Sequence, residues 1–318
     1  MNPQSIVVVV GSINTDFVLR VPRLPRPGET VTDAHFQIFS GGKGANQAVA
    51  AARLGARTLF IGKVGRDGFG ARLRRNLRAA GVRVSHLLTA ADAPSGMAFV
   101  VADAAGQNAI VVSPGANRRL TVADLKRCHR QLAAAGVILV QLEIPLPVVA
   151  YVVEFAARRR IPLILDAAPA RRLPRRLLRH IPILTANETE APVVAGPERS
   201  GRPGRLSSTR AQDLCRRLLA LGPQAAILKL GERGALVGEL RGRMTHIPAL
   251  RVQAVDSTAA GDAFNGALAV ALLEGKSVVE AARFAAAAGA FAVTRPGAQP
   301  SLPTRPALRD WLRRRRQP

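Results

Sequence analysis

The chain has 318 residues, 48% of them hydrophobic, so it is long and apolar enough to fold as one large domain or two small ones rather than stay disordered. Its formal net charge of +25 favours anionic partners such as nucleic acid, acidic membranes or phosphorylated substrates. We interpret the charge as an arginine-rich composition bias. The arginines are spread along the whole chain, and no nucleic-acid-binding motif accompanies them.

The N-terminal half begins with a β-branched run at 6–11 that ends in glycine, which is typical of a buried strand. An alanine-rich stretch predicts a helix at 45–54, and a further strand follows at 58–62. Asp67 is placed to cap a helix that runs to Ala80 and closes at Gly81. Two short strands at 96–102 and 108–113 flank a turn-prone segment, which predicts a hairpin.

The C-terminal half alternates regularly between helices and strands. Helices are predicted at 122–134, 147–159, 211–221, 260–274 and 278–292, and strands at 137–142, 162–166, 183–186, 225–229 and 235–237. Residues 196–208 are rich in Gly, Pro, Arg and Ser and predict a flexible surface loop; residues 306–315 predict a basic helix. This alternation predicts an α/β fold whose mostly parallel sheet is covered by helices on both faces.

The compartment is predicted from three features. Cys128 and Cys215 lie far apart without metal-type or redox-type spacing, as is usual in a reducing environment. The N-terminus lacks a basic segment followed by a long apolar run, and no apolar stretch reaches the length of a bilayer span. We therefore expect a cytoplasmic protein without membrane association.

Polar clusters follow several predicted strands, where doubly wound sheets bind their ligands. Asn14 and Asp16 lie two residues apart in an extended segment, so both side chains point to one side. A carboxylate and an amide in this arrangement suit vicinal sugar hydroxyls. An Asx turn that merely ends the strand explains the pair equally well.

A glycine-rich loop, S-G-G-K-G-A-N-Q at 40–47, opens the first predicted helix. Its glycines let backbone N–H groups approach a polar ligand closely. Because Gly rather than Ser or Thr follows Lys43, the loop is not a Walker A motif. A helix-entry turn without a ligand is the alternative.

Isolated carboxylates stand at two further strand ends. Glu143 lies in Q-L-E-I-P, and Asn187 and Glu190 lie in N-E-T-E. The N-x-x-E spacing puts both side chains on one face of a helix start, where Mg²⁺ could be held through water. Helix capping by Asn187 is the competing explanation.

The segment D-S-T-A-A-G-D-A-F-N at 256–265 is a small-residue turn that opens directly into an apolar helix. Free N–H groups at a helix N-terminus suit an anion, yet the carboxylate of Asp262 stands at the same place. A helix cap is the simple explanation. A cap does not need the small residues that precede it, whereas the approach of a bulky ligand does.

Taken together, these motifs resemble the ribokinase-like (PfkB) carbohydrate kinases. The signatures G-G-K-G-A-N-Q-A-V-A-A-A-R-L-G-A (41–56) and D-S-T-A-A-G-D-A-F-N-G-A-L (256–268) carry the resemblance, and shorter motifs follow the family's order along essentially the whole chain. The resemblance implies one kinase domain over 1–318, a three-layer α/β sandwich with a small β-sheet lid from about 14–39 and 96–112. It also implies a homodimer formed through the lids.

The resemblance implies the following site residues, position by position. Sugar binding would fall to Asn14, Asp16, Gly42, Lys43, Gly44, Asn46, Glu143 and Asp262. ATP binding would fall to Asn187, Lys229, Leu230, Gly231, Glu232, Arg233, Gly234, Gly261 and Asp262, and an anion hole to the backbone of Ala259, Ala260 and Gly261. Lys229 stands where the family commonly has threonine, and it could add a contact to a nucleotide phosphate.

The cofactors implied by the resemblance are ATP, Mg²⁺ and K⁺. Mg²⁺ would be supported through water by Asn187 and Glu190. K⁺ would be held by oxygens of Asp256, Thr258, Ala292, Arg295, Gly297 and Ser301.

The implied reaction is transfer of a phosphoryl group from ATP to the primary 5-hydroxyl of D-ribose, giving ribose 5-phosphate, with Asp262 as general base. Another kinase of the family, acting on deoxyribose, fructose or a nucleoside, is the alternative. A non-catalytic sugar-binding or nucleic-acid-binding protein is a further one, against which the intact Asp262 and the absence of a helix-turn-helix signature argue.

Overall fold

The computed structural model describes residues 6–103, 107–196, 207–240 and 242–315. Most of the predicted loop at 196–208 lies outside these ranges. Its end lies within them: the Ser207 hydroxyl accepts from the Arg210 N–H at 3.2 Å and caps the helix that starts at Ser208.

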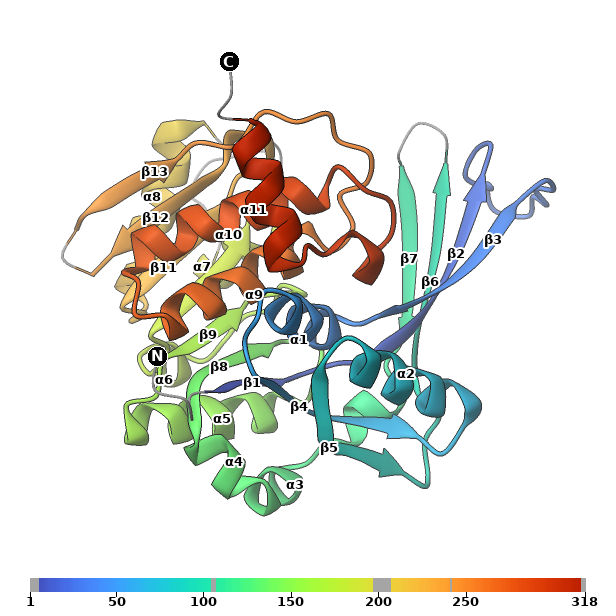
Figure 1. Ribbon diagram of the computed structural model, residues 1–318, viewed down its shortest axis with the longest axis horizontal. Helices are drawn as coiled ribbons and strands as arrows, with labels where there is room; N and C mark the ends of the chain where they lie inside the picture. Colours follow the sequence, from blue (N-terminus) through green and yellow to red (C-terminus); the bar gives the residue numbers. More distant parts are fainter. Residues whose placement is uncertain (1–5, 104–106, 197–206, 241, 316–318) are drawn as a thin grey trace.

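Nine strands of the described residues form one large sheet in the order β13-β12-β11-β10-β9-β8-β1-β4-β5 (Figure 1). All neighbours from β11 to β5 pair in parallel, whereas β12 and β13 pair antiparallel at one edge. The predicted mostly parallel sheet is thus confirmed. The strands are β1 (Ile6–Val10), β4 (Thr58–Gly65), β5 (Val82–Ala90), β8 (Ala135–Gln141), β9 (Leu163–Asp166), β10 (Ile183–Asn187), β11 (Ala225–Lys229), β12 (Ala235–Glu239) and β13 (Met244–Ile247).

Helices cover both faces of the large sheet, because its strands carry apolar side chains on both sides. One face packs against α1 (Lys43–Arg53), α2 (Gly68–Ala79), α9 (Ala260–Leu273) and α10 (Val278–Ala292). The other packs against α3 (Val122–Arg127), α4 (His129–Ala133), α5 (Leu146–Arg159), α6 (Arg175–Leu178), α7 (Glu190–Ala195) and α8 (Ser208–Ala220). The basic helix α11 (Arg305–Arg314) packs against α10 through Trp311 and Phe291.

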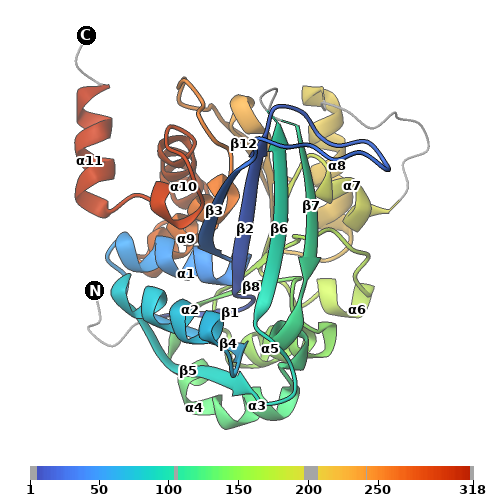
Figure 2. The ribbon, with the colours of Figure 1, turned by 90° about the vertical axis from the view of Figure 1, so that its right-hand side faces the viewer.

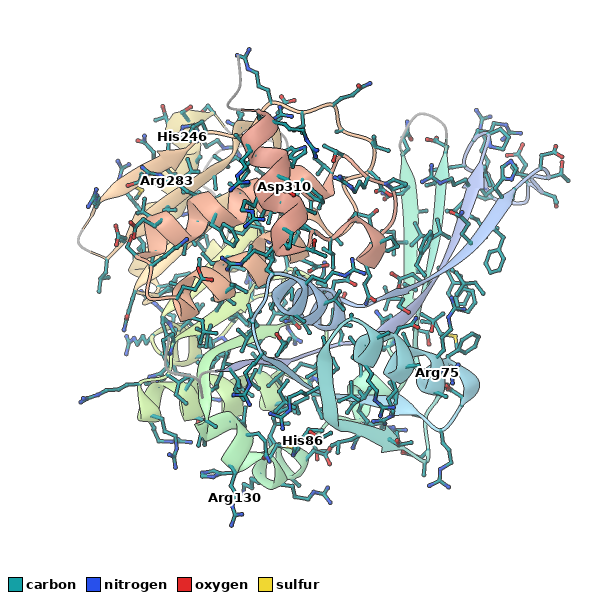
Figure 3. The ribbon with its side chains drawn as sticks, viewed as in Figure 1. Arg75, His86, Arg130, His246, Arg283 and Asp310 are labelled. Carbon is teal, nitrogen blue, oxygen red and sulfur yellow. The ribbon has the colours of Figure 1, made fainter. Side chains whose placement is uncertain are left out.

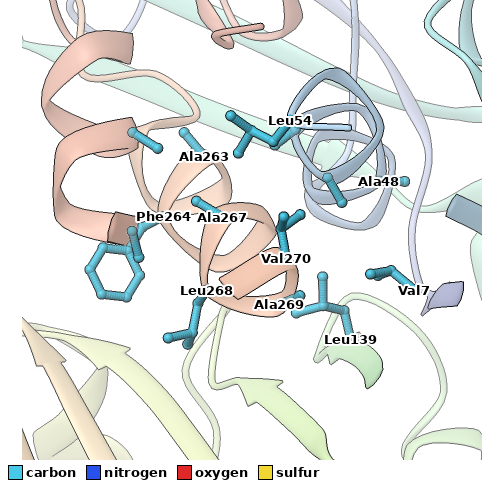
Figure 4. Close-up of a cluster of buried hydrophobic side chains, with 14 of the residues drawn as sticks. Val7, Ala48, Leu54, Leu139, Ala263, Phe264, Ala267, Leu268, Ala269 and Val270 are labelled. Carbon is cyan, nitrogen blue, oxygen red and sulfur yellow. The ribbon is translucent and has the colours of Figure 1, made fainter. Parts of the chain in front are cut away.

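Helix α9 is apolar on nearly all sides, and its residues from Asp262 to Ala271 are buried. Figure 4 shows Ala263, Ala267 and Val270 of α9 near Ala48 of α1, Leu54 at the C-terminal end of α1, and Leu139 of the sheet. Small residues make this close contact possible. A Cβ atom on Gly266 would lie 2.5 Å from the Ala50 Cβ. The start of α9 is therefore held rigidly beside α1, which follows the glycine-rich loop.

A separate four-stranded sheet of the described residues has the order β3-β2-β6-β7 and stands to one side of the sandwich (Figures 1 and 2). Its strands are β2 (Asn14–Val21), β3 (His35–Gly41), β6 (Gly96–Asp103) and β7 (Asn108–Ser113). The predicted hairpin at 96–113 is confirmed as β6 and β7. We call these four strands the small sheet.

The small sheet has two different faces, because side chains alternate along each strand. Asp16 shares its face with Ala98 and Val112, which lie opposite each other in register. Phe17 shares the other face with Phe36, Phe99 and Val111. The ring of Phe17 stacks on Phe99, with centroids 5.1 Å apart, and on Phe36 at 6.0 Å. One face is therefore polar near the base of the sheet, and the other is aromatic.

The structure differs from the predicted elements in several places. The short helix α6 was not predicted. The helix predicted at 122–134 divides at Cys128 into α3 and α4. The strands β5 and β13 were not predicted: each is an outer strand of the large sheet whose exposed and buried residues mix.

The arginines are distributed over the molecule. Arg75 of α2, Arg130 of α4 and Arg283 of α10 lie on widely separated parts of it (Figure 3). Within the described ranges, no helix combines the length and hydropathy needed to cross a bilayer.

Candidate active site

The polar side chains of the site follow from the period of the strands. Ile164 and Ile183 face α9, and the residues two positions later on β9 and β10 are Asp166 and Thr185. The same step leads from Leu139 to Gln141 on β8 and from Ile227 to Lys229 on β11. Each strand thus ends with a polar side chain on the α9 side, and parallel strands bring these ends to one edge.

A large hollow in the described residues lies elsewhere. It has a volume of about 900 Å³ and is lined by residues such as Pro162, Ile183 and Ala225 at the opposite ends of β9, β10 and β11. None of the predicted site residues lines it. The site therefore has to be located from its chemical groups rather than from the size of a cavity.

Asp262 lies in the first turn of α9 and is buried, with 7% of its surface exposed. Its Oδ2 accepts a hydrogen bond from Asn46 Nδ2 at 2.9 Å, and its Oδ1 accepts one from Gln47 Nε2 at 3.1 Å. No side-chain cap bond is formed at the start of α9, so the capping explanation for Asp262 is wrong. The carboxylate is instead held by α1 and points into the space between the two helices.

The pKa of Asp262 is raised to about 6. Burial is the main cause, and the nearby carboxylate of Asp166 adds to it, whereas Lys43 and the amides of Asn46 and Gln47 oppose it. A carboxylate with this pKa is charged at neutral pH and still accepts a proton readily. That is the property required of a general base.

Asn14 and Asp16 lie at the start of β2, where the small sheet meets the sandwich. Asn14 Oδ1 accepts from Asn117 Nδ2 at 2.7 Å, and Asn117 Oδ1 accepts from the Ile13 N–H at 3.0 Å. Asp16 packs against the backbone of Gly41, where a Cβ atom would lie 1.8 Å from its Oδ2. Neither side chain forms the local turn that was the alternative explanation for this pair.

Asp16 has the chemistry of a ligand-binding group. Its Oδ1 is buried and has no hydrogen-bond partner among the described residues, and the same holds for Asn46 Oδ1. The pKa of Asp16 is raised to about 7, first by burial and then by the charges of Glu143 and Asp262. Unsatisfied buried acceptors close to Asp262 fit the hydroxyl groups of a small polar ligand.

The glycine-rich loop places Lys43 between the carboxylates. Gly42 has φ +86°, and a Cβ atom there would lie 2.7 Å from the Asn14 N, so this tight turn requires glycine. Gly44 fits equally closely, 2.7 Å from the Gly11 Cα. The backbone N–H of Lys43 donates to Glu143 Oε2 at 3.3 Å, and the hydroxyl of Ser12 donates to the same oxygen at 2.5 Å.

The charge of Lys43 is stabilised by its surroundings. Although burial lowers the pKa of this ammonium group, the carboxylates of Asp262, Glu143, Asp166 and Glu190 raise it above its ordinary value overall. Lys43 therefore stays protonated and supplies a fixed positive charge next to Asp262.

The predicted nucleotide-binding turn connects β11 with β12. It contains the short 3₁₀ helix Gly231–Arg233, and Gly234 follows with φ +89°. The N–H of Leu230 donates to the Gly234 carbonyl at 2.8 Å, which closes the turn. Glu232 is exposed at its tip, and Arg233 pairs with Glu188. Lys229 points from this turn toward the sheet, with Nζ 2.9 Å from Asp166 Oδ1.

Asn187 and Glu190 hold the start of α7. Asn187 Oδ1 accepts from the N–H groups of Thr189 and Glu190, at 2.9 and 2.8 Å, and Glu190 Oε2 accepts from the Asn187 N–H at 2.8 Å. Asn187 thus accepts from N–H groups at the start of α7, as its capping explanation predicts, although the N-cap residue itself is Thr189. One oxygen of the Glu190 carboxylate remains for a cation or its water. The described residues contain no group of three or more His, Cys, Asp or Glu side chains arranged to bind a metal.

The turn before α9 presents backbone N–H groups. Ala259 has φ +58°, which is unusual for a residue other than glycine and is often seen at functional sites. The Ala260 N–H donates to the Ser257 carbonyl at 3.2 Å. Within the described part of the chain, the N–H groups of Gly261 and Asp262 have no recorded protein acceptor, as expected at a helix start. This terminus is partly exposed and can receive an anion.

The residues predicted to hold K⁺ come from two adjoining segments. Asp256 Oδ1 accepts from the Thr258 N–H at 2.8 Å, and its Oδ2 accepts from the Gly297 N–H at 2.9 Å. Ala292 and Arg295 are joined by a backbone bond in the turn after α10, and the hydroxyl of buried Ser301 donates to the Ala298 carbonyl. Hydrogen bonds keep the pKa of Asp256 low despite partial burial, so its oxygens carry the negative charge that suits a cation.

Several contributors to the site were not predicted, among them Gln47, which holds Asp262, and Asn117, which holds Asn14. Asp166 ends β9 and is 2% exposed, and Ser12 follows β1 and is fully buried. A polar residue two positions after a buried, inward-facing one is a signal in the sequence, and it would have indicated Asp166. The role of Ser12 depends on Glu143, 131 residues away, and no local pattern indicates it.

Comparisons with known proteins agree with this geometry. The family model described as pfkB family carbohydrate kinase matches residues 4–305. The ribokinase of Haemophilus influenzae is 40% identical over 306 residues, covering 96% of this chain and 98% of that protein. The deoxyribokinase of Salmonella typhi is 34% identical over 307 residues, covering 96% and 98%.

The solved structure of Arabidopsis thaliana ribokinase complexed with ribose and ATP superposes with a TM-score of 0.86 at 34% identity, covering 97% of this chain and 98% of that one. The superposition includes both the sandwich and the small sheet, and it confirms the predicted fold class. The sequence match along nearly the whole chain shows that this protein belongs to the pfkB family of carbohydrate kinases.

Proposed function

We propose that the protein is an ATP-dependent ribose kinase that transfers the γ-phosphoryl group of ATP to the primary 5-hydroxyl of D-ribose. The observation that carries the proposal is the setting of Asp262. This buried carboxylate is held by Asn46 and Gln47 at the start of α9, beside backbone N–H groups that suit a phosphoryl group. The similarity to several ribokinases supports ribose as the sugar.

Ribose binds between the small sheet and the sandwich in this proposal. Asn14, Asp16 and Glu143 take its hydroxyl groups, and the unsatisfied oxygens of Asp16 and Asn46 supply acceptors that match hydroxyl donors. Backbone groups of Gly42, Lys43 and Gly44 come close to the sugar because the two glycines carry no side chain. The small sheet acts as a lid over the sugar.

Asp262 accepts the proton of the 5-hydroxyl as the hydroxyl oxygen attacks the γ-phosphorus. The bond between the γ-phosphorus and the β–γ bridging oxygen breaks in the same step, and ADP leaves with the electron pair. The Lys43 ammonium and the N–H groups around Gly261 stabilise the negative charge of the transferred group. Asp262 is thus a proton acceptor within an anion-binding cradle. It can serve there because the hydroxyl loses its proton only as the phosphoryl group arrives.

ATP lies along the turn formed by Lys229–Gly234 and the start of α9, with Asn187 at its edge. Mg²⁺ would be held through water by Glu190, next to Asn187, and when bound it neutralises phosphate charge. K⁺ would be held by oxygens of Asp256 and of the 292–301 segment, where it would fix the turn before α9. We place the protein in the cytoplasm as a homodimer.

The test of the base is the variant Asp262→Asn, which keeps the shape of the side chain. Its kcat should fall on the order of 10²–10⁴-fold, the usual contribution of a general base. Ribose binding measured by calorimetry should be largely retained, because the hydroxyl-binding groups are unchanged. A variant that turns over at nearly the wild-type rate would remove Asp262 from the mechanism.

Deoxyribose is the second candidate substrate, since a deoxyribokinase is 34% identical along nearly the full chain. The two sugars differ only at the 2-hydroxyl. Comparing kcat/KM for both sugars at the same ATP concentration distinguishes the two assignments.

A further inference from the structure

Asp166 is a buried carboxylate to which nothing in the proposed mechanism assigns a role. It ends β9 on the side that faces α9 and is 2% exposed. Removing a carboxylate from water is unfavourable unless partners compensate for its charge. The identity of its partners therefore indicates what it does.

The two oxygens of Asp166 hold two different groups. Oδ1 accepts from Lys229 Nζ at 2.9 Å and lies 3.2 Å from the Thr185 hydroxyl. Oδ2 accepts from Gln47 Nε2 at 3.0 Å. The ammonium of Lys229 and the amide of Gln47 are thereby fixed on opposite sides of one carboxylate.

Gln47 connects Asp166 to the proposed base. Its Nε2 also donates to Asp262 Oδ1 at 3.1 Å, so both amide protons point at carboxylates. Its Oε1 accepts from Gln141 Nε2 at 2.7 Å, which prevents the amide from turning over. All of these side chains are buried, so the orientation of Asp262 depends on the position of Asp166.

Lys229 is the last residue of β11, and its ammonium group lies beside the start of α9. Its Nζ is 3.4 Å from the point where a Cβ atom of Gly261 would stand. A cation beside the positive end of a helix is unfavourable by itself, because the partial charges repel. The arrangement is favourable when Asp166 offsets the charge and an anion occupies the helix start.

We propose that Asp166 is a positioning residue that fixes the phosphate-facing ammonium of Lys229 and, through Gln47, the base Asp262 in one geometry. This inference rests on the proposed kinase function. It assigns Lys229 a contact with the transferred phosphoryl group, and it makes the Lys229–Asp166 pair part of the catalytic geometry rather than only of the fold.

Charged groups reach Asp262 from every side of the pocket. Lys43 approaches from α1, Asp166 from β9 with Lys229 of β11 behind it, and Asp16 and Glu143 from the sugar side. Changing one member of the Lys229–Asp166 pair alters the charge that Asp262 senses through Gln47. Because the carboxyl of Asp16 in the same pocket has a pKa of about 7 and also titrates, the effect on Asp262 is read from the difference between the variants and wild type rather than from one profile.

The experiment uses the full chain with ribose and ATP and compares Lys229→Met, Asp166→Asn and the double variant. Lys229→Met should lower kcat by about 10²-fold, as loss of one transition-state donor does, with KM for ribose nearly unchanged. The acid limb of the kcat/KM profile should move to higher pH in Lys229→Met, where the Asp166 charge is uncompensated, and to lower pH in Asp166→Asn. In the double variant the limb should return toward wild type.

A second lysine–aspartate pair of similar burial provides the control. Lys63 Nζ lies 2.7 Å from Asp124 Oδ2 on the opposite face of the large sheet. The side chains of Lys63 and Asp124 are 13% and 4% exposed, and those of Lys229 and Asp166 are 15% and 2% exposed. Lys63→Met and Asp124→Asn should lower the melting temperature and leave the pH limb in place. Wild-type kcat and an unmoved pH limb in both Lys229→Met and Asp166→Asn would overturn the inference.

A failure of the kinase assignment is recognised separately, because the wild-type chain would then release no ADP with ribose. If Lys229→Met does not fold, the near-isosteric Asp166→Asn and the double variant test the inference instead. The measured quantity is again the position of the acid limb in their kcat/KM profiles.

Discussion

Asp16 and Asp262 are acidic groups in a buried pocket, and their environment has an effect on stability. The pKa of Asp16 is about 7 in the folded chain and 3.8 in the absence of the fold, mainly because burial disfavours the charged form. Between these values the folded protein binds the proton more tightly than the unfolded one. The stability contributed by neutral Asp16 is therefore present at low pH and lost as the pH rises through about 7.

The variant Asp16→Asn tests this effect, because it keeps the shape and removes the charge. Measured by calorimetry without sugar, it should melt at a higher temperature than wild type at pH 8. The difference should shrink toward pH 5, where the wild-type carboxyl is protonated. An advantage that is the same at both pH values would contradict the account.

Asp67 provides a control, because its pKa is shifted in the opposite direction to that of Asp16. It caps α2, and although burial opposes this, hydrogen bonds from Ser95 and Gly70 hold its pKa below the ordinary value. Asp67→Asn should therefore be destabilised at neutral pH, with a loss that becomes smaller on acidification. If both variants follow the same pH trend, the pocket does not act through the charge of Asp16.

At the scale of elements, the contact between α9 and α1 sets the position of Asp262, the proposed base. A Cβ atom on Gly266 would lie 2.8 Å from the Gln47 carbonyl as well as close to Ala50. Gly266→Ala should lower the free energy of unfolding by about 1–3 kcal/mol through overpacking, even though alanine favours helix. It should also lower kcat, since Gln47 orients Asp262.

Gly68→Ala is the matched control for this substitution. Gly68 begins α2, and no atom lies within 4 Å of the position that a Cβ would take. Its effect in urea denaturation should stay within about 0.5 kcal/mol. A Gly266→Ala protein that unfolds and turns over like Gly68→Ala would mean that α9 and α1 can separate without consequence.

How well each helix or strand could be predicted from the sequence depends on how it is buried. Long apolar helices such as α9 and α10 and the buried strands β1 and β8 were predicted nearly to their ends, because burial on all sides leaves an unbroken apolar run. The outer strand β5 alternates between buried and exposed residues only over its first half, Val82–Ser85, and so short an alternation is a weak signal.

The candidate site was predictable where a glycine or a polar residue stands in a local motif. Gly42 and Asn46 belong to one such motif, and Asp262 to another. Sequence did not indicate the contacts of Asp166 with Gln47 and Lys229, because these residues are 119 and 63 positions away from it and meet only in the folded sheet.

At the scale of the whole molecule, the small sheet exposes apolar side chains on both faces; Ile110 and Val112 on the face of Asp16 are 56% and 46% exposed, and the aromatic side chains are on the other. Val111, Phe36 and Phe99 are 69%, 53% and 44% exposed and lie on the face opposite Asp16. Exposed apolar patches of this kind mark association surfaces. We predict that two chains pair through this face, and that each pairing leaves the polar face free for the sugar.

Light scattering tests the pairing. The wild-type chain should have twice the 33.7 kDa mass of one chain, and Val111→Lys should have the mass of one, because two ammonium groups cannot be buried together. Val193→Lys, at a 42% exposed position on α7, should remain paired. A wild-type monomer, or a paired Val111→Lys protein, would exclude this surface.

The most direct measurement for the whole account is ADP release by the wild-type chain with ribose, deoxyribose, fructose and adenosine, each with and without K⁺. Hydroxyl-binding groups at Asn14 and Asp16, together with a base at Asp262, predict the highest kcat/KM for ribose. The proposed K⁺ site at Asp256 and the 292–301 segment predicts faster turnover when K⁺ is present. No ADP release above background with any of the sugars, or a preference for adenosine, would contradict the account.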